Sequence, residues 1–255
     1  MSNALSAFRG AKSEVPEIKF TIPSTEEVIY LRPFTTREQK AILKAIEKED
    51  LQLMNEAFDS LIKACVITKG FNVDELLTKD RDALLIELRK ESVKDDFSFN
   101  WECKKCEHKN EDSMSLNKLK FKKLKKKENL MMELELSDRP LKLKLQLPTR
   151  KFEKMLFTHL KGDISAVDVM NITLAISICS VIVKDEEGNP QEIEPTFKER
   201  VEILDEVCID DKKKIENFLK GIEAYGYDMN IGKRNCAECD KENEVELNWS
   251  DFFLM

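Results

Sequence analysis

The chain has 255 residues, of which 42% are hydrophobic and 36% charged, and its formal net charge is −7. This composition is typical of a soluble globular protein with one large or two small domains. The negative charge disfavours general nucleic-acid binding, which depends on Lys and Arg. No apolar stretch approaches the ~18 residues of a membrane-spanning helix, and Met1–Lys12 lacks the apolar core of a signal peptide, so we expect a cytosolic protein.

A β-hairpin is the first predicted element after residues 1–15, which we expect to form a flexible arm. Apolar residues alternate in Ile18–Ile22 and in Val28–Leu31, on either side of Pro23-Ser24-Thr25. Alternation of this kind is typical of strands with one buried face.

Helices and a further strand complete the first half of the chain. Thr35 and Glu38 have the spacing of a capping box, which predicts the start of a helix. Apolar residues recur at helical spacing in Met54–Cys65 and again in Ala83–Leu88. The alternation in Phe97–Trp101 then predicts a strand that leads into the first pair of cysteines.

A lysine-rich run separates the two halves. Seven lysines occur within Lys118–Lys127, inside a predicted linker that covers residues 118–130. Leu119 and Leu124 interrupt the run, so it is compatible with a partly helical segment or an extended edge. As a solvated linker it needs no partner, whereas as an interaction patch it would bind an acidic protein surface or nucleic acid. Phe121 is its one aromatic residue and Arg is absent, so base stacking is poorly supported.

The second half repeats this order of elements. Leu134–Leu136 and Leu141–Leu145 alternate as a second hairpin, and Asp185–Pro195 is rich in loop-forming residues. Thr196 and Glu199 have the spacing of another capping box. The other helices of this half are predicted at residues 150–160, 167–181 and 211–224. Strands are predicted at residues 227–231 and 245–249, on either side of the second pair of cysteines.

We interpret the repeated order as an internal duplication, with chance similarity as the alternative because many of the matches are only apolar to apolar. Ile18–Ile67 aligns without gaps with Met132–Val181, at a constant shift of 132 − 18 = 114 residues. A repeat of this length indicates two copies of one supersecondary unit. The predicted fold class is therefore α+β, with tandem copies of one unit in residues 16–117 and 131–255. Each unit consists of a hairpin, helices and a knuckled hairpin, that is, a hairpin whose turn carries a pair of cysteines.

Four of the seven cysteines form two Cys-x-x-Cys pairs, each at a predicted turn between strands. In a reducing compartment this arrangement favours a metal site over disulfides. Two such pairs supply four thiolates for a tetrahedral zinc, so we predict one structural zinc shared by the two repeats. The predicted ligands are Cys103, Cys106, Cys236 and Cys239.

Alternatives to this zinc site are a redox dithiol, unmetallated cysteines, or replacement of one cysteine by His108. A redox pair is typically found at a helix N-terminus, whereas strand-like residues follow both pairs here. The remaining cysteines are Cys65, Cys179 and Cys208, which we interpret as small apolar residues in helical contexts.

Signatures of catalysis are absent from the sequence. It lacks a glycine-rich nucleotide-binding loop, a phosphate-binding Gly-Lys-Ser/Thr motif and a His-Glu-x-x-His motif. His159 lies among apolar residues of a predicted helix, where a packed histidine is the usual interpretation. Four cysteine ligands would close the metal site to substrate. We therefore expect a protein that is not an enzyme and that has no catalytic or cofactor-binding residues.

Short motifs in the first half resemble a known family. Ile18–Thr25, followed by Tyr30–Thr35, is similar to the opening of the baseplate hub subunit family of large contractile-tailed bacteriophages. Asp96–Leu116 is similar to the cysteine-bearing stretch of that family. The sequence departs from the family at Glu26-Glu27, where a glycine-containing turn is expected. The resemblance covers residues 15–116 well and the second half more weakly, and it implies a hub or hub-assembly component without catalysis.

Such a component would bind other phage baseplate hub and tail proteins, with no small-molecule substrate and no membrane. It would act in the host cytoplasm during assembly or in the virion tail baseplate. The predicted binding surfaces are the hairpin edges Val28–Leu31 and Leu141–Leu145, which would offer unpaired backbone groups for strand addition. The alternatives are a zinc-ribbon nucleic-acid-binding module that uses Lys118–Lys127, and a thiol oxidoreductase.

Overall fold

The structure is a computed structural model of the chain. It describes residues 4, 6, 16–93, 95–124, 130–159, 165–223, 225–249 and 251–253. Apart from residues 4 and 6, the predicted flexible arm of residues 1–15 lies outside the described residues.

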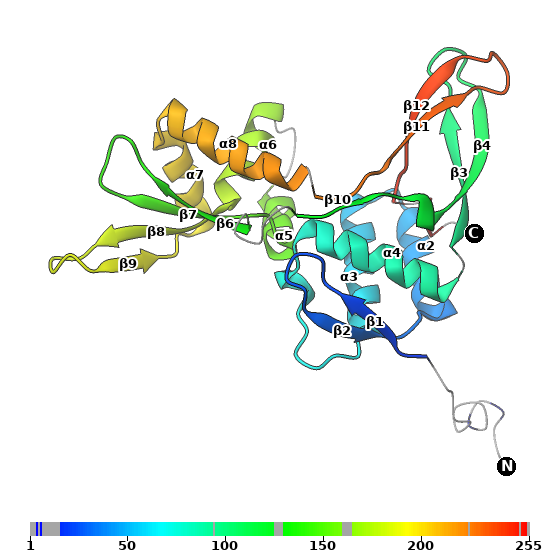
Figure 1. Ribbon diagram of the computed structural model, residues 1–255, viewed down its shortest axis with the longest axis horizontal. Helices are drawn as coiled ribbons and strands as arrows, with labels where there is room; N and C mark the ends of the chain where they lie inside the picture. Colours follow the sequence, from blue (N-terminus) through cyan, green and yellow to red (C-terminus); the bar gives the residue numbers. More distant parts are fainter. Residues whose placement is uncertain are drawn as a thin grey trace.

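The described elements form two lobes and a projecting arm (Figure 1). The first lobe contains β1 (Ile18–Thr21), β2 (Val28–Leu31), α2 (Thr36–Ile46), α3 (Leu51–Cys65), the 3-10 turn η1 (Val73–Glu75) and α4 (Thr78–Ser92). The second lobe contains β6 (Met131–Glu135), β7 (Lys142–Gln146), α5 (Arg150–His159), α6 (Ala166–Ile176), β8 (Ile178–Lys184), β9 (Pro190–Ile193), α7 (Phe197–Glu206) and α8 (Ile209–Glu223). The arm contains β3 (Asp96–Glu102), β4 (Lys109–Ser115), β11 (Asn230–Asn235) and β12 (Glu242–Glu246).

Local signals in the sequence explain where the first lobe's helices begin. The backbone N–H of Thr35 donates to the Glu38 carboxylate at 2.6 Å, which completes the predicted capping box before α2. The Asp50 carboxylate accepts the N–H groups of Gln52 and Leu53 and so caps α3. The apolar faces of these helices pack together with β1 and β2, and the resulting core includes Ile42, Phe58, Ile62 and Leu84.

The end of the chain completes the core of the first lobe. Phe252 and Phe253 are almost fully buried there, and their rings lie 5.0 Å from Phe97 and 5.1 Å from Phe58 respectively. The Arg89 Nε donates to the carbonyl of Phe252 at 2.6 Å. The first lobe is therefore closed by residues more than 150 positions away from its own helices.

The second lobe is built on an antiparallel sheet with the strand order β6-β7-β8-β9. One face of the sheet packs against the helices, through a core that includes Leu134, Leu143, Leu145 and Leu204. The opposite face is polar and carries the ion pairs of Lys142 with Glu133 and of Lys144 with Glu192.

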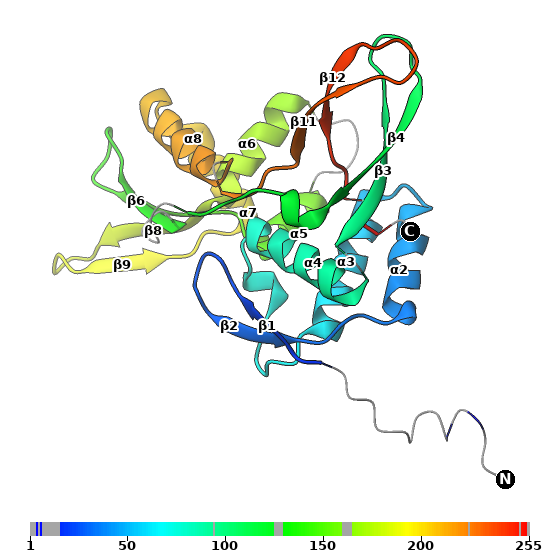
Figure 2. The ribbon, with the colours of Figure 1, turned by 45° about the vertical axis from the view of Figure 1, so that its right-hand side comes forward.

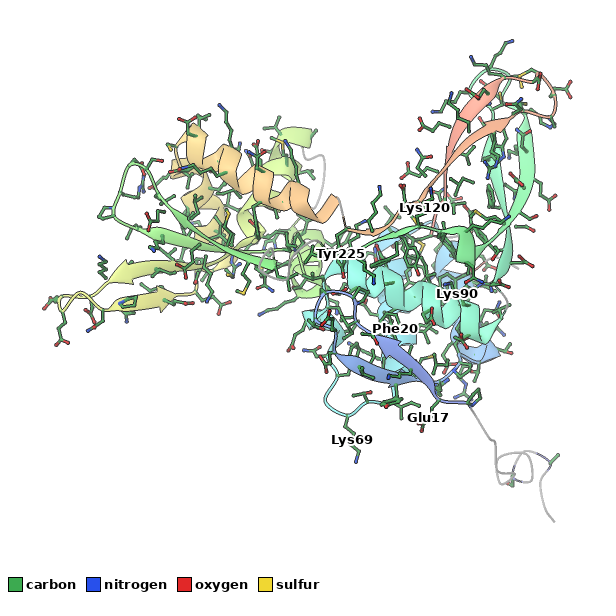
Figure 3. All side chains as sticks on the ribbon, viewed as in Figure 1. Glu17, Phe20, Lys69, Lys90, Lys120 and Tyr225 are labelled. Atoms are coloured by element: carbon green, nitrogen blue, oxygen red, sulfur yellow. The ribbon has the colours of Figure 1, made fainter. Side chains whose placement is uncertain are left out.

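A buried ion cluster joins the two lobes. Asp59 of α3 accepts from Arg81 of α4 at 2.8 Å and from Arg150, the first residue of α5, at 2.9 and 3.0 Å. All three side chains are at most 5% exposed. Tyr225, which Figure 3 labels between the lobes, donates to the buried Asp80 carboxylate of α4.

The lysine-rich run is part of the folded structure up to residue 124. Leu116 and Leu119 are buried, and Phe121–Lys122 forms β5, which pairs with β10 (Gly226–Tyr227). The 3-10 turn η2 (Leu116–Lys118) precedes it. Lys122 forms an ion pair with Asp228 at 2.9 Å, and Lys120 is labelled near the base of the arm in Figure 3. The lysines at 125–127 lie outside the described residues.

Several sequence-based predictions of local structure are wrong. Residues 178–181, predicted as the end of the helix at residues 167–181, instead begin β8 (Ile178–Lys184), because an apolar run of this kind also suits a buried strand. The predicted loop Asp185–Pro195 includes β9, which pairs with β8. Cys179 consequently lies in a strand, and Cys208 lies between α7 and α8; of the three apolar cysteines, only Cys65 is helical.

The predicted strand edges are also wrong. β7, which contains most of Leu141–Leu145, is an interior strand with β6 and β8 on its two sides. The outer side of β2 is occupied by the segment after α3: Ile67 donates to the Tyr30 carbonyl at 2.8 Å, and Leu31 bridges Val66. Neither strand offers the row of unpaired backbone groups that strand addition requires.

Candidate metal centre at the tip of the arm

The two cysteine pairs lie at the turns of the two hairpins that form the arm. Cys103 and Cys106 connect β3 to β4, and Cys236 and Cys239 connect β11 to β12. The hairpins run beside each other in both views (Figures 1 and 2). Farther down the arm, Arg234 of β11 donates to Asp112 of β4 at 2.9 Å. Each pair is therefore carried by a tight turn at the end of a supported hairpin.

The two turns have the same backbone geometry. In the first, the N–H of Cys103 donates to the His108 carbonyl at 3.0 Å, and the N–H of Glu107 donates to the Cys103 carbonyl at 2.9 Å. In the second, Cys236 and Asp240 donate in the same way at 3.0 and 2.9 Å. Glu107 and Asp240 are both left-handed, with φ of 58° and 54°. Each turn thus presents its two sulfurs toward the other hairpin.

The four sulfurs form one compact cluster. The sulfur atoms of Cys103 and Cys239 are 3.7 Å apart, those of Cys106 and Cys236 are 3.6 Å apart, and all four lie within 4.8 Å of one another. Sulfurs bound tetrahedrally to zinc at about 2.3 Å would be about 3.8 Å from one another. The four cysteines could therefore hold a metal ion, and the observed spacing fits one of zinc's size.

Two asparagines support the cluster reciprocally. The Asn110 amide donates to the Cys236 sulfur at 3.7 Å, and its oxygen accepts the N–H of Ala237 at 2.9 Å. Asn243 does the same in the opposite direction, donating to Cys103 at 3.5 Å and accepting the N–H of Lys104 at 3.0 Å. Both asparagines are buried. Supporting contacts of this kind orient metal ligands and stabilise their charge.

Sequence reasoning did not assign a role to Asn110 or Asn243. A signal for them was present, since each stands four residues after the second cysteine of its pair. Only the pairing of the hairpins places each asparagine against the cysteines of the other turn.

Backbone N–H groups favour the thiolate form of Cys103 and Cys236, which is the form that binds metal. The Lys105 backbone N–H, 3.5 Å from the Cys103 sulfur, is the main cause that lowers the pKa of Cys103 to about 6. Burial by itself would raise the pKa of Cys236, but the N–H groups of Cys239 and Glu238 outweigh it, so that this pKa is also lowered. At Cys106 the His108 backbone N–H acts in the same direction, but burial and hydrogen bonds with the other three cysteines outweigh it and raise the pKa of Cys106 to about 12.

The positions of the residues give little support to the alternatives, a redox dithiol or a histidine ligand. Neither pair stands at a helix N-terminus, where a redox dithiol would be expected. The side chain of His108 is exposed and is not part of the four-residue cluster. His159, the other histidine of the chain, stacks on Phe197 in the second lobe, with ring centroids 3.6 Å apart.

Comparison with known proteins identifies one family. The family model described as T4 bacteriophage base plate protein matches residues 15–254, which is nearly the whole chain. No curated protein and no solved structure matches the chain. In the part of the chain that the structure describes, no helix is long and apolar enough to cross a membrane.

Proposed function

Because the chain belongs to the T4 bacteriophage base plate protein family, we propose that it is a structural or assembly component of the baseplate hub, held together by a structural zinc. Membership of this family supports a structural component of a phage baseplate, and it suggests interaction with other tail or baseplate proteins and a non-enzymatic role. The hub position is supported by the resemblance of Ile18–Thr35 and Asp96–Leu116 to hub subunits.

One observation supports the proposed zinc: four sulfurs from two hairpins, distant in sequence, lie within 4.8 Å of one another, with two pairs across the hairpins at 3.6 and 3.7 Å. Bound zinc would contribute folding free energy directly by holding the two hairpins together. Four thiolates leave no open coordination position, so the site would be structural rather than catalytic. We propose Cys103, Cys106, Cys236 and Cys239 as its ligands.

We also propose that the two halves arose by duplication. In the first lobe, Ser24 of the hairpin turn donates its N–H and its hydroxyl to Asp80, in the first turn of α4. In the second lobe, Ser137 donates the same two groups to Asp211, in the first turn of α8. The reciprocal cysteine turns support the same origin. An experimental structure in which residues 130–249 followed a different element order would refute it.

The lysine-rich run gives no support to a nucleic-acid-binding module. Leu119 is buried, Phe121 is half-buried against the rings of Tyr225 and Tyr227, and Lys122 is paired with Asp228. The ring of Phe121, the aromatic residue of the run, is therefore not available for base stacking.

The decisive experiment measures metal content and assembly in parallel. We expect the wild-type protein, purified under reducing conditions, to contain about one zinc per chain by mass spectrometry of the digested sample. Cys236→Ser should lose the metal, melt at a lower temperature and recover less baseplate protein when tagged and isolated from infected cells. Cys179→Ser is the matched control, because this cysteine lies outside the cluster.

Wild-type protein with almost no metal, or a Cys236→Ser variant with its metal intact, would refute the zinc site. Recovery of no baseplate or tail protein by the wild type would refute the hub role, whatever the metal content. Reversible formation of a disulfide within each cysteine pair, with reduction of a test disulfide, would favour the oxidoreductase alternative.

A further inference from the structure

An apolar groove remains open at one end of the second lobe's core. It has a volume of about 360 Å³ and lies between the sheet and α7. Its apolar lining includes Leu136, Leu141, Val181, Ile193, Ile203 and Val207. The volume is within the range of about 300–1,000 Å³ that is typical of ligand pockets.

Incomplete helix cover explains why the groove is open. Leu134, Leu143, Val181 and Ile193 are direct neighbours across β6, β7, β8 and β9, and they face the helices as one apolar row. Leu134 and Leu143 are buried, Val181 is half-buried, and Ile193 at the edge strand is 49% exposed. The helices therefore cover the β6 end of the row and leave the β9 end uncovered.

Carboxylates border the same groove. Glu199, Glu202 and Glu206 recur at spacings of three and four residues, which places them on one face of α7. Glu202 and Glu206 are largely exposed, and their partners Lys198 and Arg139 contact them in exposed ion pairs of the kind that contribute little. Arg139 also lines the groove, so the groove has an apolar floor and a rim on which carboxylates outnumber cations.

Strand addition is a poor use of this end of the sheet. The edge strand β9 has four residues and begins with Pro190, which has no N–H to donate. A helix is better suited, because a helix buries apolar side chains at spacings of three and four residues in a groove without needing backbone hydrogen bonds.

We propose that this groove binds an amphipathic helix of another baseplate protein, with aliphatic side chains on one face and Lys or Arg beside them. The proposal rests on the proposed function as a baseplate component, and it names the chemistry of one partner segment. The acidic rim selects basic flanks, and the uncovered row from Val181 to Ile193 receives the aliphatic side chains. A second copy is a poorer occupant, because the lysine-rich segment already packs Leu119 and Phe121 in its own fold.

A designed peptide tests this chemistry on the full-length protein. The probe is a synthetic amphipathic helix with Leu on one face and Lys on the other, and its counterpart has Glu in place of every Lys. We expect the Leu/Lys peptide to shift the methyl NMR signals of Val181, Ile193 and Ile203 saturably. The Leu/Glu peptide should bind at least about tenfold more weakly, since like charges oppose it.

Variants at the groove separate specific docking from general attraction to an acidic protein. Ile193→Glu should weaken Leu/Lys peptide binding about tenfold, and the double variant Glu202→Lys, Glu206→Lys should favour the Leu/Glu peptide. Tyr30→Glu is the matched control, because Tyr30 is similarly exposed, at 44%, on the first lobe. Equal binding by Ile193→Glu and wild type, or equal binding of both peptides, would overturn the proposal.

The native partner can be mapped by placing a photo-crosslinking amino acid, p-benzoylphenylalanine, at position 193 in infected cells. A crosslinked peptide that is a basic amphipathic helix from a baseplate protein supports the proposal. An acidic or extended peptide, a second copy of this chain, or no adduct overturns it. These outcomes are independent of zinc content and of partners that bind other surfaces, so the groove can fail while the proposed function stands.

Discussion

The two lobes begin with the same order of elements but enclose their cores to different extents. Each has a hairpin followed by helices, and in each a serine of the hairpin turn donates twice to an aspartate of a later helix. The first lobe then receives Phe252 and Phe253 from the end of the chain, whereas among the described residues no such segment closes the second lobe, which keeps an open groove. Closure of a core therefore depends on what the rest of the chain adds to a unit.

The largest expected effect tests this difference in closure directly. Phe252→Ala removes a fully buried ring from the first lobe and should lower the free energy of unfolding by about 3–5 kcal/mol. Ile193→Ala at the open groove is the comparison and should cost less than about 1 kcal/mol, because half of that side chain is already exposed. Urea unfolding followed by circular dichroism measures both. Similar losses for the two variants would contradict the contrast between a closed and an open lobe.

An effect of intermediate size on the free energy of unfolding is expected from the two buried aspartates, Asp80 and Asp211. Burial raises the pKa of Asp80 and outweighs the hydrogen bonds from Ser24 and Tyr225. The Lys214 ammonium lowers the pKa of Asp211, and the N–H and hydroxyl of Ser137 act in the same direction. The same serine–aspartate arrangement thus has opposite pKa shifts, because burial dominates at Asp80, whereas Asp211 has the Lys214 ammonium at 2.7 Å.

Opposite shifts predict opposite dependences of stability on pH. Asp80 binds its proton more tightly in the folded state than in the unfolded state. Its contribution to the free energy of unfolding is therefore fully present below about pH 4 and is lost as pH rises through its raised pKa. Asp211 contributes above about pH 4, and this contribution is lost as pH falls toward its lowered pKa. The stability difference between wild type and Asp80→Asn should therefore grow as pH is lowered from 7 to 4. For Asp211→Asn it should shrink as pH is lowered below about 4.

Urea unfolding at several pH values, with both variants measured beside the wild type, determines these differences. Other carboxylates affect all three proteins alike and cancel. If the stability difference from wild type changed with pH in the same direction for both variants, the serine–aspartate contacts of the two lobes would be electrostatically equivalent.

The smallest effect is expected on the polar face of the second lobe's sheet. Glu192→Gln removes the charge that pairs with Lys144 at 2.9 Å. We expect a loss below about 1 kcal/mol, because both side chains are partly exposed and the pair is screened by solvent. The loss should diminish further in 1 M salt. A cost of several kcal/mol would mean that this face contributes to stability as a buried network does.

Much of the local structure was predictable because its causes are local. The capping box at Thr35, the alternation in Ile18–Ile22 and the periodicity of Met54–Cys65 each depend on neighbours within a few residues. Periodicity was insufficient at residues 178–184, because a continuous apolar run suits both a buried helix and an interior strand. The partner strands β7 and β9 determine that it is a strand.

The candidate metal site was likewise predictable in part. Spacing within each Cys-x-x-Cys pair was sufficient to select Cys103, Cys106, Cys236 and Cys239, because two thiols at one tight turn point to a shared ion. The supporting roles of Asn110 and Asn243, by contrast, depend on which hairpin lies against which.

Contacts between distant segments account for the rest of what could not be predicted. The outer side of β2 is filled by the residues after α3, and the first core is closed by Phe252 and Phe253. The α7 groove is open because no segment within the described part of the chain covers Ile193. Such contacts depend on how whole elements pack, and hydrophobic burial carries little directional information by which a sequence pattern could specify them. Hydrogen bonds, in contrast, are short and directional. A helix cap therefore needs particular residues at fixed spacing, and such a spacing can be recognised in the sequence.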